Sequence, residues 1–275
     1  MKVPILCYHS CNAGDSYATD DHFALASDLR TIYGLGFRVV PLDWIVEALL
    51  GKRDPLEKCV GLTCDDGVDL DWIDADHPTF GRRRSFANIV RDFSAETGSI
   101  SPPIEMTSFV IASATARKEL EAACLGGLDW WNDTWWRSAE ASGAWKIESH
   151  SFDHVHPLAS RVAQRHQRKG NFGLVDTWED CEMQVAAASD YIGRRSGRTP
   201  TYFAYPYGQA SAYLRGEYLP RRGHELGLEA AFSIEHAYVT LSSDRWFLPR
   251  YTHGATDTSS PADLERILRD SSVDD

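Results

Sequence analysis

Two short stretches of the sequence contain side chains that could together hold a catalytic metal ion. The first is the doublet Asp65-Asp66, and the second, residues 150–154, begins with His150 and ends with His154. Two histidines four residues apart lie on one side of a helical turn or a tight loop, so both can reach one ion about 2.0–2.1 Å from each nitrogen. One carboxylate and two imidazoles can hold zinc, and the second aspartate would remain free to act as a base.

Neither stretch is strong evidence by itself. An Asp-Asp-Gly sequence is also typical of a solvated turn, and His156 makes the second stretch rich in histidines of the kind found on surfaces. Residue 151 is serine, which argues against the His-Glu-x-x-His motif of metalloproteases. Only the combination of the two stretches predicts a metal-dependent hydrolase.

Each stretch follows a short run with the composition of a buried strand. Residues 59–63 are mostly apolar and stop just before Asp65, and residues 145–149 directly precede His150. Successive strand residues point to opposite sides, but at a strand end next to Gly67 the chain can direct both carboxylates toward one cavity. We therefore expect both stretches to lie where a strand gives way to a loop.

Strand and helix patterns alternate along the chain, which favours an α/β fold with a parallel sheet. Strand patterns occupy residues 3–8, 37–40 and 106–111, and helical patterns occupy residues 20–35, 42–50 and 176–192. Phe23 and Leu29 belong to the expected apolar side of the first helix, and Cys181 and Val185 to that of the last. Periodicity does not distinguish an open sheet from a barrel, but in both folds active residues gather at the carboxyl ends of the strands.

The order of these motifs resembles that of the polysaccharide deacetylases of carbohydrate esterase family 4. That family is marked by a Thr-Phe-Asp-Asp-Gly strand end and a His-Ser/Thr-x-x-His segment, which stand here as TCDDG at residues 63–67 and HSFDH at residues 150–154. Three further segments fit the family, namely residues 3–9, 203–208 and 247–250. The resemblance thus extends over most of the chain.

The resemblance implies a distorted (β/α) barrel with about seven parallel strands. The whole chain, residues 1–275, would form a single catalytic domain, with an insertion-like segment at about residues 68–105. That segment contains many charged side chains and a predicted helix at residues 85–96. A solvated charged loop is its simplest interpretation, and it could also shape a substrate groove.

The resemblance also implies a role for each residue of the motif segments. Asp66, His150 and His154 would bind a divalent metal ion, with zinc expected from the ligand types, and Asp65 would take the proton from the attacking water. Three protein ligands leave coordination positions open, as a catalytic metal requires. The backbone N–H of Tyr207 would stabilise the oxyanion. The residues expected to contact the sugar are Tyr205, Pro206 and Tyr207.

Two departures from the family pattern concern the remaining catalytic groups. Many relatives carry an arginine before the Pro-Tyr-Gly turn that pairs with the base, and this chain has none there. Arg250, at the end of a late predicted strand, is its predicted replacement, since an arginine beside Asp65 would keep that carboxylate ionised. The late Leu-x-His-Asp segment that supplies the general acid is also missing. His9, at the end of the first strand, is the first candidate for that role, and His253 is the second.

Four tryptophans form a cluster in the sequence. Trp130, Trp131, Trp135 and Trp136 are spaced so that they would lie largely on one side of a helix. Core packing is the simpler expectation, and a platform on which a sugar stacks is the alternative. One of them could still line the rim of the site.

The composition excludes some partners. The formal net charge of −12 disfavours nucleic acid and anionic membrane surfaces, and no transmembrane run is present, so an acetylated glycan is the expected partner. No secretory signal follows Met1, so as the chain stands we expect a cytoplasmic protein, or a secreted or periplasmic one if the sequence is trimmed. The six cysteines form no Cys-x-x-Cys pair and are expected to be free thiols.

Three functions compete at this stage. The best supported is removal of acetyl groups from an N-acetylated amino-sugar polysaccharide or oligosaccharide, and O-deacetylation of a glycan such as xylan would use the same residues. An amidohydrolase-type metal enzyme is the second, because His154 and His156 form a His-x-His pair, but this pair comes late in the chain and leaves Asp65 without a role. A carbohydrate-binding protein with an inactive site is the third, and the complete set of ligands and base argues against it.

Overall fold

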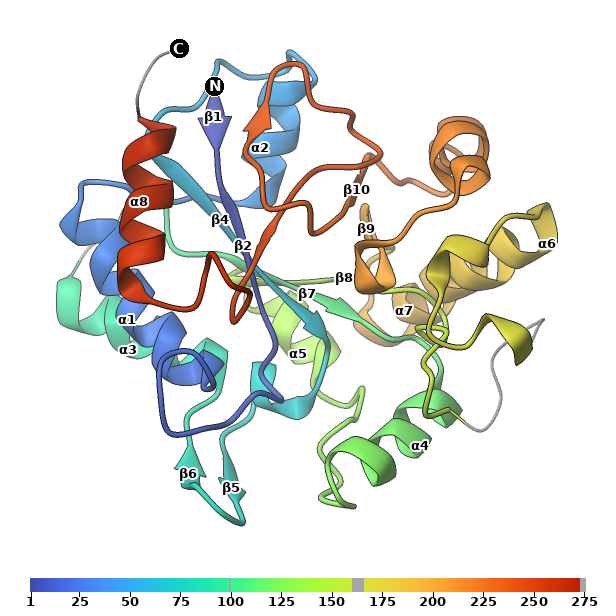
Figure 1. Ribbon diagram of the computed structural model, residues 1–275, viewed down its shortest axis with the longest axis horizontal. Helices are drawn as coiled ribbons and strands as arrows, with labels where there is room; N and C mark the ends of the chain where they lie inside the picture. The colour runs from blue at the N-terminus through green and yellow to red at the C-terminus, as the bar shows by residue number, and fades with distance from the viewer. Residues whose placement is uncertain (99, 160–165, 273–275) are drawn as a thin grey trace.

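The structure is a computed structural model that describes residues 1–98, 100–159 and 166–272. Its centre is a parallel sheet in which seven strands follow one another in the order β10-β9-β8-β7-β4-β2-β12 (Figure 1). These strands are β2 (Ile5–Tyr8), β4 (Cys59–Asp66), β7 (Met106–Val110), β8 (Trp145–Ser149), β9 (Tyr202–Ala204), β10 (Ala230–Phe232) and β12 (Tyr251–Thr252). The sheet curls into a half-barrel, which confirms the predicted distorted (β/α) barrel.

Three short pairings lie beside this path. β3 (Arg38–Val39) runs parallel to the beginning of β4. β1 (Lys2–Val3) pairs antiparallel with β11 (Val239–Thr240), and β5 (Ala75–His77) forms an antiparallel hairpin with β6 (Gly81–Arg83). The hairpin projects beyond the sheet in Figure 1.

One irregular segment links the two outer strands of the sheet. Leu248 forms a parallel bridge with Phe232 of β10, and the carbonyl of Arg250 accepts a hydrogen bond of 3.1 Å from the backbone N–H of His236. The next two residues form β12, which pairs with β2. Residues 248–252 therefore span the gap between the first and last strands. Arg250, predicted at the end of a late strand, instead directly precedes one.

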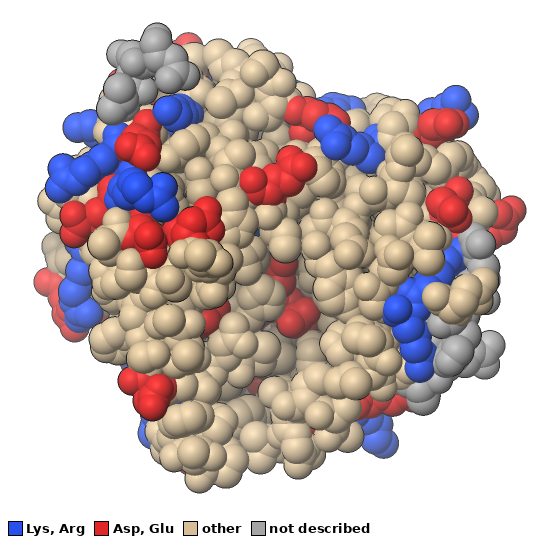
Figure 2. All heavy atoms as spheres, in the orientation of Figure 1, with Lys and Arg blue, Asp and Glu red and all other residues tan. Residues whose placement is uncertain are grey.

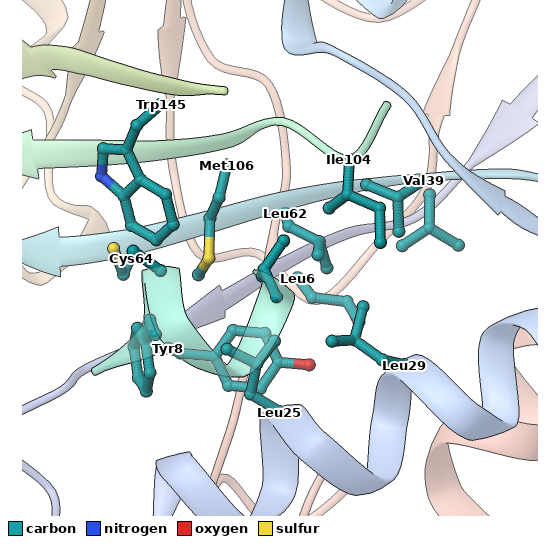
Figure 3. Close-up of a cluster of buried hydrophobic side chains, with 14 of the residues drawn as sticks. Leu6, Tyr8, Leu25, Leu29, Val39, Leu62, Cys64, Ile104, Met106 and Trp145 are labelled. Carbon is teal, nitrogen blue, oxygen red and sulfur yellow. The ribbon is translucent and has the colours of Figure 1, made fainter. Parts of the chain in front are cut away.

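Most helices share a hydrophobic core with one face of the sheet. Figure 3 shows Leu25 and Leu29 of α1 pointing toward the strand side chains Leu6, Leu62 and Met106. The helices are α1 (Asp21–Gly34), α2 (Leu42–Leu49), α3 (Phe86–Thr97), α4 (Ala114–Cys124), α5 (Trp136–Ala141), α6 (Trp178–Cys181), α7 (Ala187–Ser196) and α8 (Pro261–Ser271). The bundle of α1, α3, α5, α7 and α8 around this face buries the apolar side chains whose removal from water drives folding.

The helix α2 packs against the opposite face of the sheet. Its Leu42 and Ile45 share a second hydrophobic cluster with Ile5 of β2. A side chain at Gly61 of β4 would approach the methyl carbons of Leu42 and Ile45 to 2.9 Å, so the glycine lets helix and strand come close.

The predicted helices form, with some differences in their faces and ends. α1 begins at Asp21 because the side chain of Asp20 caps it, but Phe23 is 59% exposed, so its predicted place on the apolar side is wrong. The buried stripe runs through Leu25, Leu29 and Ile32, so the prediction for Leu29 is confirmed. The helix predicted at residues 176–192 extends from α6 through a π-helical turn into α7 and buries Cys181 and Val185 as expected.

The segment between β4 and β7, residues 68–105, is more ordered than a charged loop. It contains a short 3-10 turn (Asp69–Asp71), the β5–β6 hairpin and α3, which begins one residue after the predicted start because Ser85 caps it. Asp71 is fully buried and accepts hydrogen bonds from the hydroxyls of Ser10 at 2.5 Å and Ser108 at 2.7 Å. These bonds fasten the start of the segment to the sheet.

Two simpler features complete the description. Among the described residues no helix has the length and apolar character needed to cross a membrane. The six cysteines are free in the structure.

Candidate active site

The two aspartates of the doublet reach one cavity through a change of backbone direction. The strand β4 was predicted to stop just before Asp65, but it continues to Asp66, which pairs with Val110 of β7. Strand alternation places Asp65 on the same face as Thr63 and would place Asp66 on the other. Asp66 has a φ of 77°, a left-handed conformation that turns its side chain back toward the cavity. Gly67 allows this turn, because a side chain there would meet Val110 at 2.5 Å.

The two histidines lie in a tight loop that follows β8. Ser151 and His154 have φ values of 70° and 61°, so the chain folds back on itself within four residues. The hydroxyl of Ser151 accepts a hydrogen bond of 3.0 Å from the backbone N–H of His154 and fixes the turn. The two imidazole rings are 4.8 Å apart. Positive φ at non-glycine residues costs free energy and often marks functional sites.

The three predicted ligands converge. The Nε2 atoms of His150 and His154 lie 3.9 and 3.7 Å from Oδ1 of Asp66, and one ligand atom from each residue lies within 4.8 Å of the others. Ligand atoms roughly 2.1 Å from one tetrahedral ion are roughly 3.4 Å apart, so small side-chain movements would complete the geometry. The Asp-His-His donor set therefore fits a divalent metal ion with open coordination positions.

The orientation of each imidazole is fixed by its other nitrogen. Nδ1 of His150 is 2.9 Å from the carbonyl of Ala204, and Nδ1 of His154 is 3.1 Å from the hydroxyl of Tyr207. A carbonyl can only accept, so His150 is protonated at Nδ1 and presents the lone pair of Nε2 to the cavity. Burial, and after it the neighbouring imidazoles of His150 and His156, lower the pKa of His154 well below its ordinary value, so the ring of His154 is neutral.

Asp65 is held by the predicted arginine. Nη1 and Nη2 of Arg250 donate to the two carboxylate oxygens of Asp65 at 2.7 and 2.8 Å, and Nη1 also donates to Thr63 at 3.1 Å. Arg250 is fully buried and Asp65 nearly so. Burial by itself raises the pKa of Asp65, but the charge and hydrogen bonds of Arg250 outweigh burial and hold this pKa well below its usual range. Asp65 is therefore a carboxylate at any physiological pH.

A second group of possible metal ligands is formed by Cys7, His9 and Asp65, whose donor atoms lie within 4.8 Å of one another. Both oxygens of Asp65 are already bound by Arg250, and burial raises the pKa of the Cys7 thiol, which keeps it protonated. The Asp66 group is the better metal site for these two reasons.

The two candidates for the general acid lie in different places. His9 lines the same cavity as Asp65 and Asp66. His253 stacks on Tyr8 with ring centroids 5.7 Å apart, lies 3.0 Å from a carboxylate oxygen of Asp21 and faces a separate small cavity. Only His9 is therefore placed to reach a substrate bound near the metal ligands.

The three predicted metal ligands, Asp65 and His9 line one open cavity of about 340 Å³. Figure 2 shows the middle of this face hollowed, with acidic side chains in the hollow and most lysines and arginines toward the edges. No lysine or arginine is among the described residues that line the cavity. The lining residues are His9, Cys11, Asp65, Asp66, Cys124, Leu125, Trp131, His150, His154, His156, Tyr205, Tyr207, Gly208, Ile234 and Thr252.

The three residues expected to contact the sugar are placed differently. Tyr207 lines the cavity and has a φ of 57°, and its N–H has no acceptor among the described residues outside its own short turn. Tyr205 also lines the cavity, but it is fully buried and its hydroxyl donates to the carbonyl of Trp246 at 2.7 Å. Pro206 is buried and is not among the lining residues. Tyr207 is thus the best placed of the three to contact a substrate.

A brace on Asp66 was not foreseen from the sequence. Nε1 of Trp131 donates a hydrogen bond of 2.9 Å to the carbonyl of Asp66. The next residue, Asn132, donates from its backbone and side chain to the carboxylate of Asp69 at 2.9 and 3.0 Å. These bonds fix the turn that presents the metal-ligating carboxylate. The acidic Asp69 just after the doublet and the Trp-Asn pair were the available signals, but nothing in the sequence joins them.

The prediction of a helix through all four tryptophans is wrong. α5 begins only at Trp136, and residues 126–133 form a loop in which Gly126, Gly127 and Asp129 have positive φ. The prediction of core packing is confirmed for Trp131, Trp135 and Trp136, which are at most 7% exposed. Trp131 also lines the cavity, which is the second possibility that the sequence left open for one of the four.

Known proteins resemble this chain in sequence family and in fold. The family model described as polysaccharide deacetylase matches residues 52–219. IcaB from Ammonifex degensii has a TM-score of 0.66 at 18% identity, with 99% of this chain and 97% of that chain covered. The deacetylase PplD of Streptococcus pyogenes, in complex with acetate, has a TM-score of 0.65 at 15% identity, with 98% of each chain covered. A de-N-acetylase from Aggregatibacter actinomycetemcomitans has a TM-score of 0.61 at 15% identity, with 97% of this chain and 100% of that chain covered. At these identities the likenesses show the fold, and no curated sequence matches the chain.

Replacing Arg250 by methionine tests whether it keeps Asp65 ionised. Without the guanidinium, the effect of burial on the carboxyl group is no longer outweighed, so the pKa of Asp65 should rise well above its value in the parent protein. The pKa is measured by carbon-13 NMR titration of labelled aspartate, with Asp65→Asn to assign the signal. Arg250→Lys keeps a positive charge and should give a smaller rise. An unchanged titration in a folded Arg250→Met protein would refute the role of the pair.

Replacing Trp131 by phenylalanine tests the brace on Asp66. The ring remains but the N–H donor is lost, so the affinity for Zn²⁺ should fall by about tenfold, as measured by competition with a chelator. Trp136→Phe is the matched control, because the indole N–H of Trp136 is buried and has no partner among the described residues. Equal zinc affinity of Trp131→Phe and the parent would show that the bond does not position the ligand.

Proposed function

Because the chain belongs to the polysaccharide deacetylase family, we propose that it hydrolyses the acetyl groups of an N-acetylated amino-sugar polysaccharide or oligosaccharide with the help of a divalent metal ion, for which zinc is our expectation. The observation that carries this proposal is the convergence of Asp66, His150 and His154 beside an aspartate that Arg250 keeps ionised. This arrangement combines three metal ligands and a base in one cavity.

The metal ion would polarise the acetyl carbonyl and make water acidic enough to attack it at neutral pH. Asp65 accepts the proton that the attacking water loses, since its carboxylate lies 3.8 Å from Nε2 of His150 and so borders the metal site. Arg250 acts through Asp65, because its two hydrogen bonds to the carboxylate fix the orientation of that group. The backbone N–H of Tyr207 donates to the oxyanion that forms when water adds to the carbonyl.

The reaction ends when the C–N bond breaks and the leaving amine takes a proton. His9 supplies this proton, because it lines the cavity, is outside the Asp66, His150 and His154 set and, unlike His156, does not lie within two residues of a ligand. The backbone N–H of His9 donates to the carboxylate of Asp21 at 2.7 Å, which anchors the end of β2 on which the ring is carried. The products are acetate and a free amine.

The cavity favours a neutral glycan. The described residues that line the cavity include no lysine or arginine to pair with an anionic polymer, and the acidic groups of the lining tolerate the amine that the reaction releases. The similar structure from Aggregatibacter actinomycetemcomitans is called a de-N-acetylase, which supports N-deacetylation over O-deacetylation. An ester of an acetylated xylan is the alternative substrate, since the same groups would act on it.

Acetate release from N-acetylglucosamine oligomers and from acetylated xylan tests the proposal. Activity should disappear on complete chelation and return with Zn²⁺. Asp65→Asn should bind zinc, yet its rate should fall on the order of 10²- to 10⁴-fold, because the general base is lost. His150→Ala should lose zinc binding and activity together. Full activity after metal removal, or in Asp65→Asn, would contradict the mechanism.

Replacing His9 by asparagine tests the general acid. The rate of the His9→Asn protein with an N-acetyl sugar should fall by roughly 10²-fold or more, because an amine cannot leave without a proton. Its rate with 4-nitrophenyl acetate should change far less, because nitrophenolate leaves without one. His253→Asn is the control, and a selective loss of amide hydrolysis there, with none in His9→Asn, would transfer the role to His253.

A further inference from the structure

An aromatic strip crosses the β5–β6 hairpin next to the active-site cavity. The ring of His77 lies 4.8 Å from that of Phe80, at the tip of the hairpin, and 5.9 Å from that of Trp130. Phe80 is 39% exposed, although large apolar side chains on a surface usually avoid water. Arg83 lies under Phe80, with its guanidinium carbon 5.1 Å from the ring centroid. We call Trp130, His77 and Phe80 the aromatic strip.

The aromatic strip is continuous with the wall of the cavity. Trp131, which lines the cavity, belongs to a small hydrophobic cluster that also includes Val68 and Ile111. The partly buried residues on the edge of this cluster are Cys11, Ala75, Leu125 and Trp130. Cys11 and Leu125 line the cavity, whereas Ala75 belongs to the hairpin and Trp130 to the strip. One apolar cluster thus packs against both the cavity wall and the hairpin.

The hairpin is held rigidly. Arg83 donates to the buried carboxylate of Asp20 at 2.7 Å and to the carbonyl of Gly14 at 2.8 Å. Asp74, just before the hairpin, accepts hydrogen bonds from the backbone N–H of Ser85 at 2.8 Å and from Asn88 at 2.6 Å. A ligand would therefore meet a surface that needs little ordering on binding, which favours affinity.

The hydrogen bonds of His77 leave a donor free for a ligand. Nδ1 of His77 accepts from the backbone N–H groups of Thr79 and Phe80 at 3.1 and 3.2 Å. The ring proton is therefore on Nε2, for which the described residues provide no acceptor. Burial and the charge of Arg83 lower the pKa of His77, which keeps the ring neutral. Aromatic faces with one or two hydrogen-bond donors suit the apolar faces and hydroxyl groups of a sugar.

The charges of the hairpin argue for a neutral ligand. Each of its arginines has a carboxylate partner: Arg82 is 3.7 Å from Asp74, Arg83 is bound to Asp20, and Arg84 is 2.7 Å from Asp74. An anionic polymer would have to displace these pairs, because no arginine of the hairpin is left unpaired. A neutral glycan requires no such exchange.

We propose that the aromatic strip is a binding subsite for the sugars that continue a neutral glycan beyond the residue being deacetylated. This inference rests on the proposed function, since it supplies the substrate's extension from the same cavity. It predicts that the hairpin favours long chains over short ones, while the chemistry of the reacting acetyl group stays unchanged.

Phe80→Ala is the test, because it removes the most exposed ring of the strip. Its kcat/KM for the hexamer of N-acetylglucosamine should fall roughly 3- to 10-fold, through KM, while its rate with 4-nitrophenyl acetate should equal that of the parent. Phe80→Tyr keeps the ring and should restore the preference. Trp178→Ala is the matched control, because Trp178 is 45% exposed on α6, far from the hairpin in Figure 1.

Binding separates this inference from the proposed function. Calorimetry with the hexamer and the Asp65→Asn protein, with and without Phe80→Ala, reports the subsite whether or not acetate is released. If Phe80→Ala weakens hexamer binding while the parent protein releases no acetate from any acetylated glycan, the subsite is supported and the proposed function is rejected. Equal binding and equal chain-length preference of Phe80→Ala and the parent would overturn the subsite. Tighter binding of a polygalacturonate hexamer than of the neutral hexamer would also overturn it.

Discussion

The buried ion pair between Asp65 and Arg250 is the interaction on which the rest of the site depends. Arg250 belongs to the segment that links the two outer strands, and Asp65 belongs to the inner strand β4, so the pair joins the closure of the half-barrel to the interior of the sheet. Removing one partner of such a pair typically costs about 3–5 kcal/mol, because a buried charge is left alone. The two parallel hydrogen bonds offset the desolvation of both charges and leave the carboxylate ionised beside the metal ligands.

The second constraint is backbone direction. Asp66, Ser151, His154 and Tyr207 all have positive φ, and all four lie in or beside the site. Regular strand and turn geometry would point these groups apart, so the fold accepts a local conformational cost at each position. Hydrogen bonds stabilise two of these strained conformations. Nε1 of Trp131 donates to the carbonyl of Asp66, and the Ser151 hydroxyl accepts from the N–H of His154 in the same loop. A precise site is thus built at strand ends from residues that are individually strained.

The connection between β4 and β7 and the loop before α5 work together at the edge of this site. Asp69 from the first and Asn132 from the second are hydrogen-bonded, and Trp130 and Trp131 of the loop lie between the hairpin and the cavity. The same contacts that steady the Asp66 turn therefore also place the aromatic strip beside the cavity. Metal affinity and substrate length would be set by one packed region, through separate side chains of it.

The sequence by itself determined the α/β class and several of the strands and helices, because alternating patterns depend on residues close in the chain. Its motifs and family resemblance also singled out Asp65, Asp66, His150, His154 and Arg250, which the structure brings together. It did not determine which histidine faces the cavity. His9 and His253 are both plausible in the sequence, and only the packing of His253 against Tyr8 and Asp21 separates them. The bond from Trp131 to Asp66 joins residues 65 positions apart, and the exposure of Phe23 depends on which helix face meets the sheet. Such contacts are decided by tertiary structure, since no local pattern records which distant segments pack together.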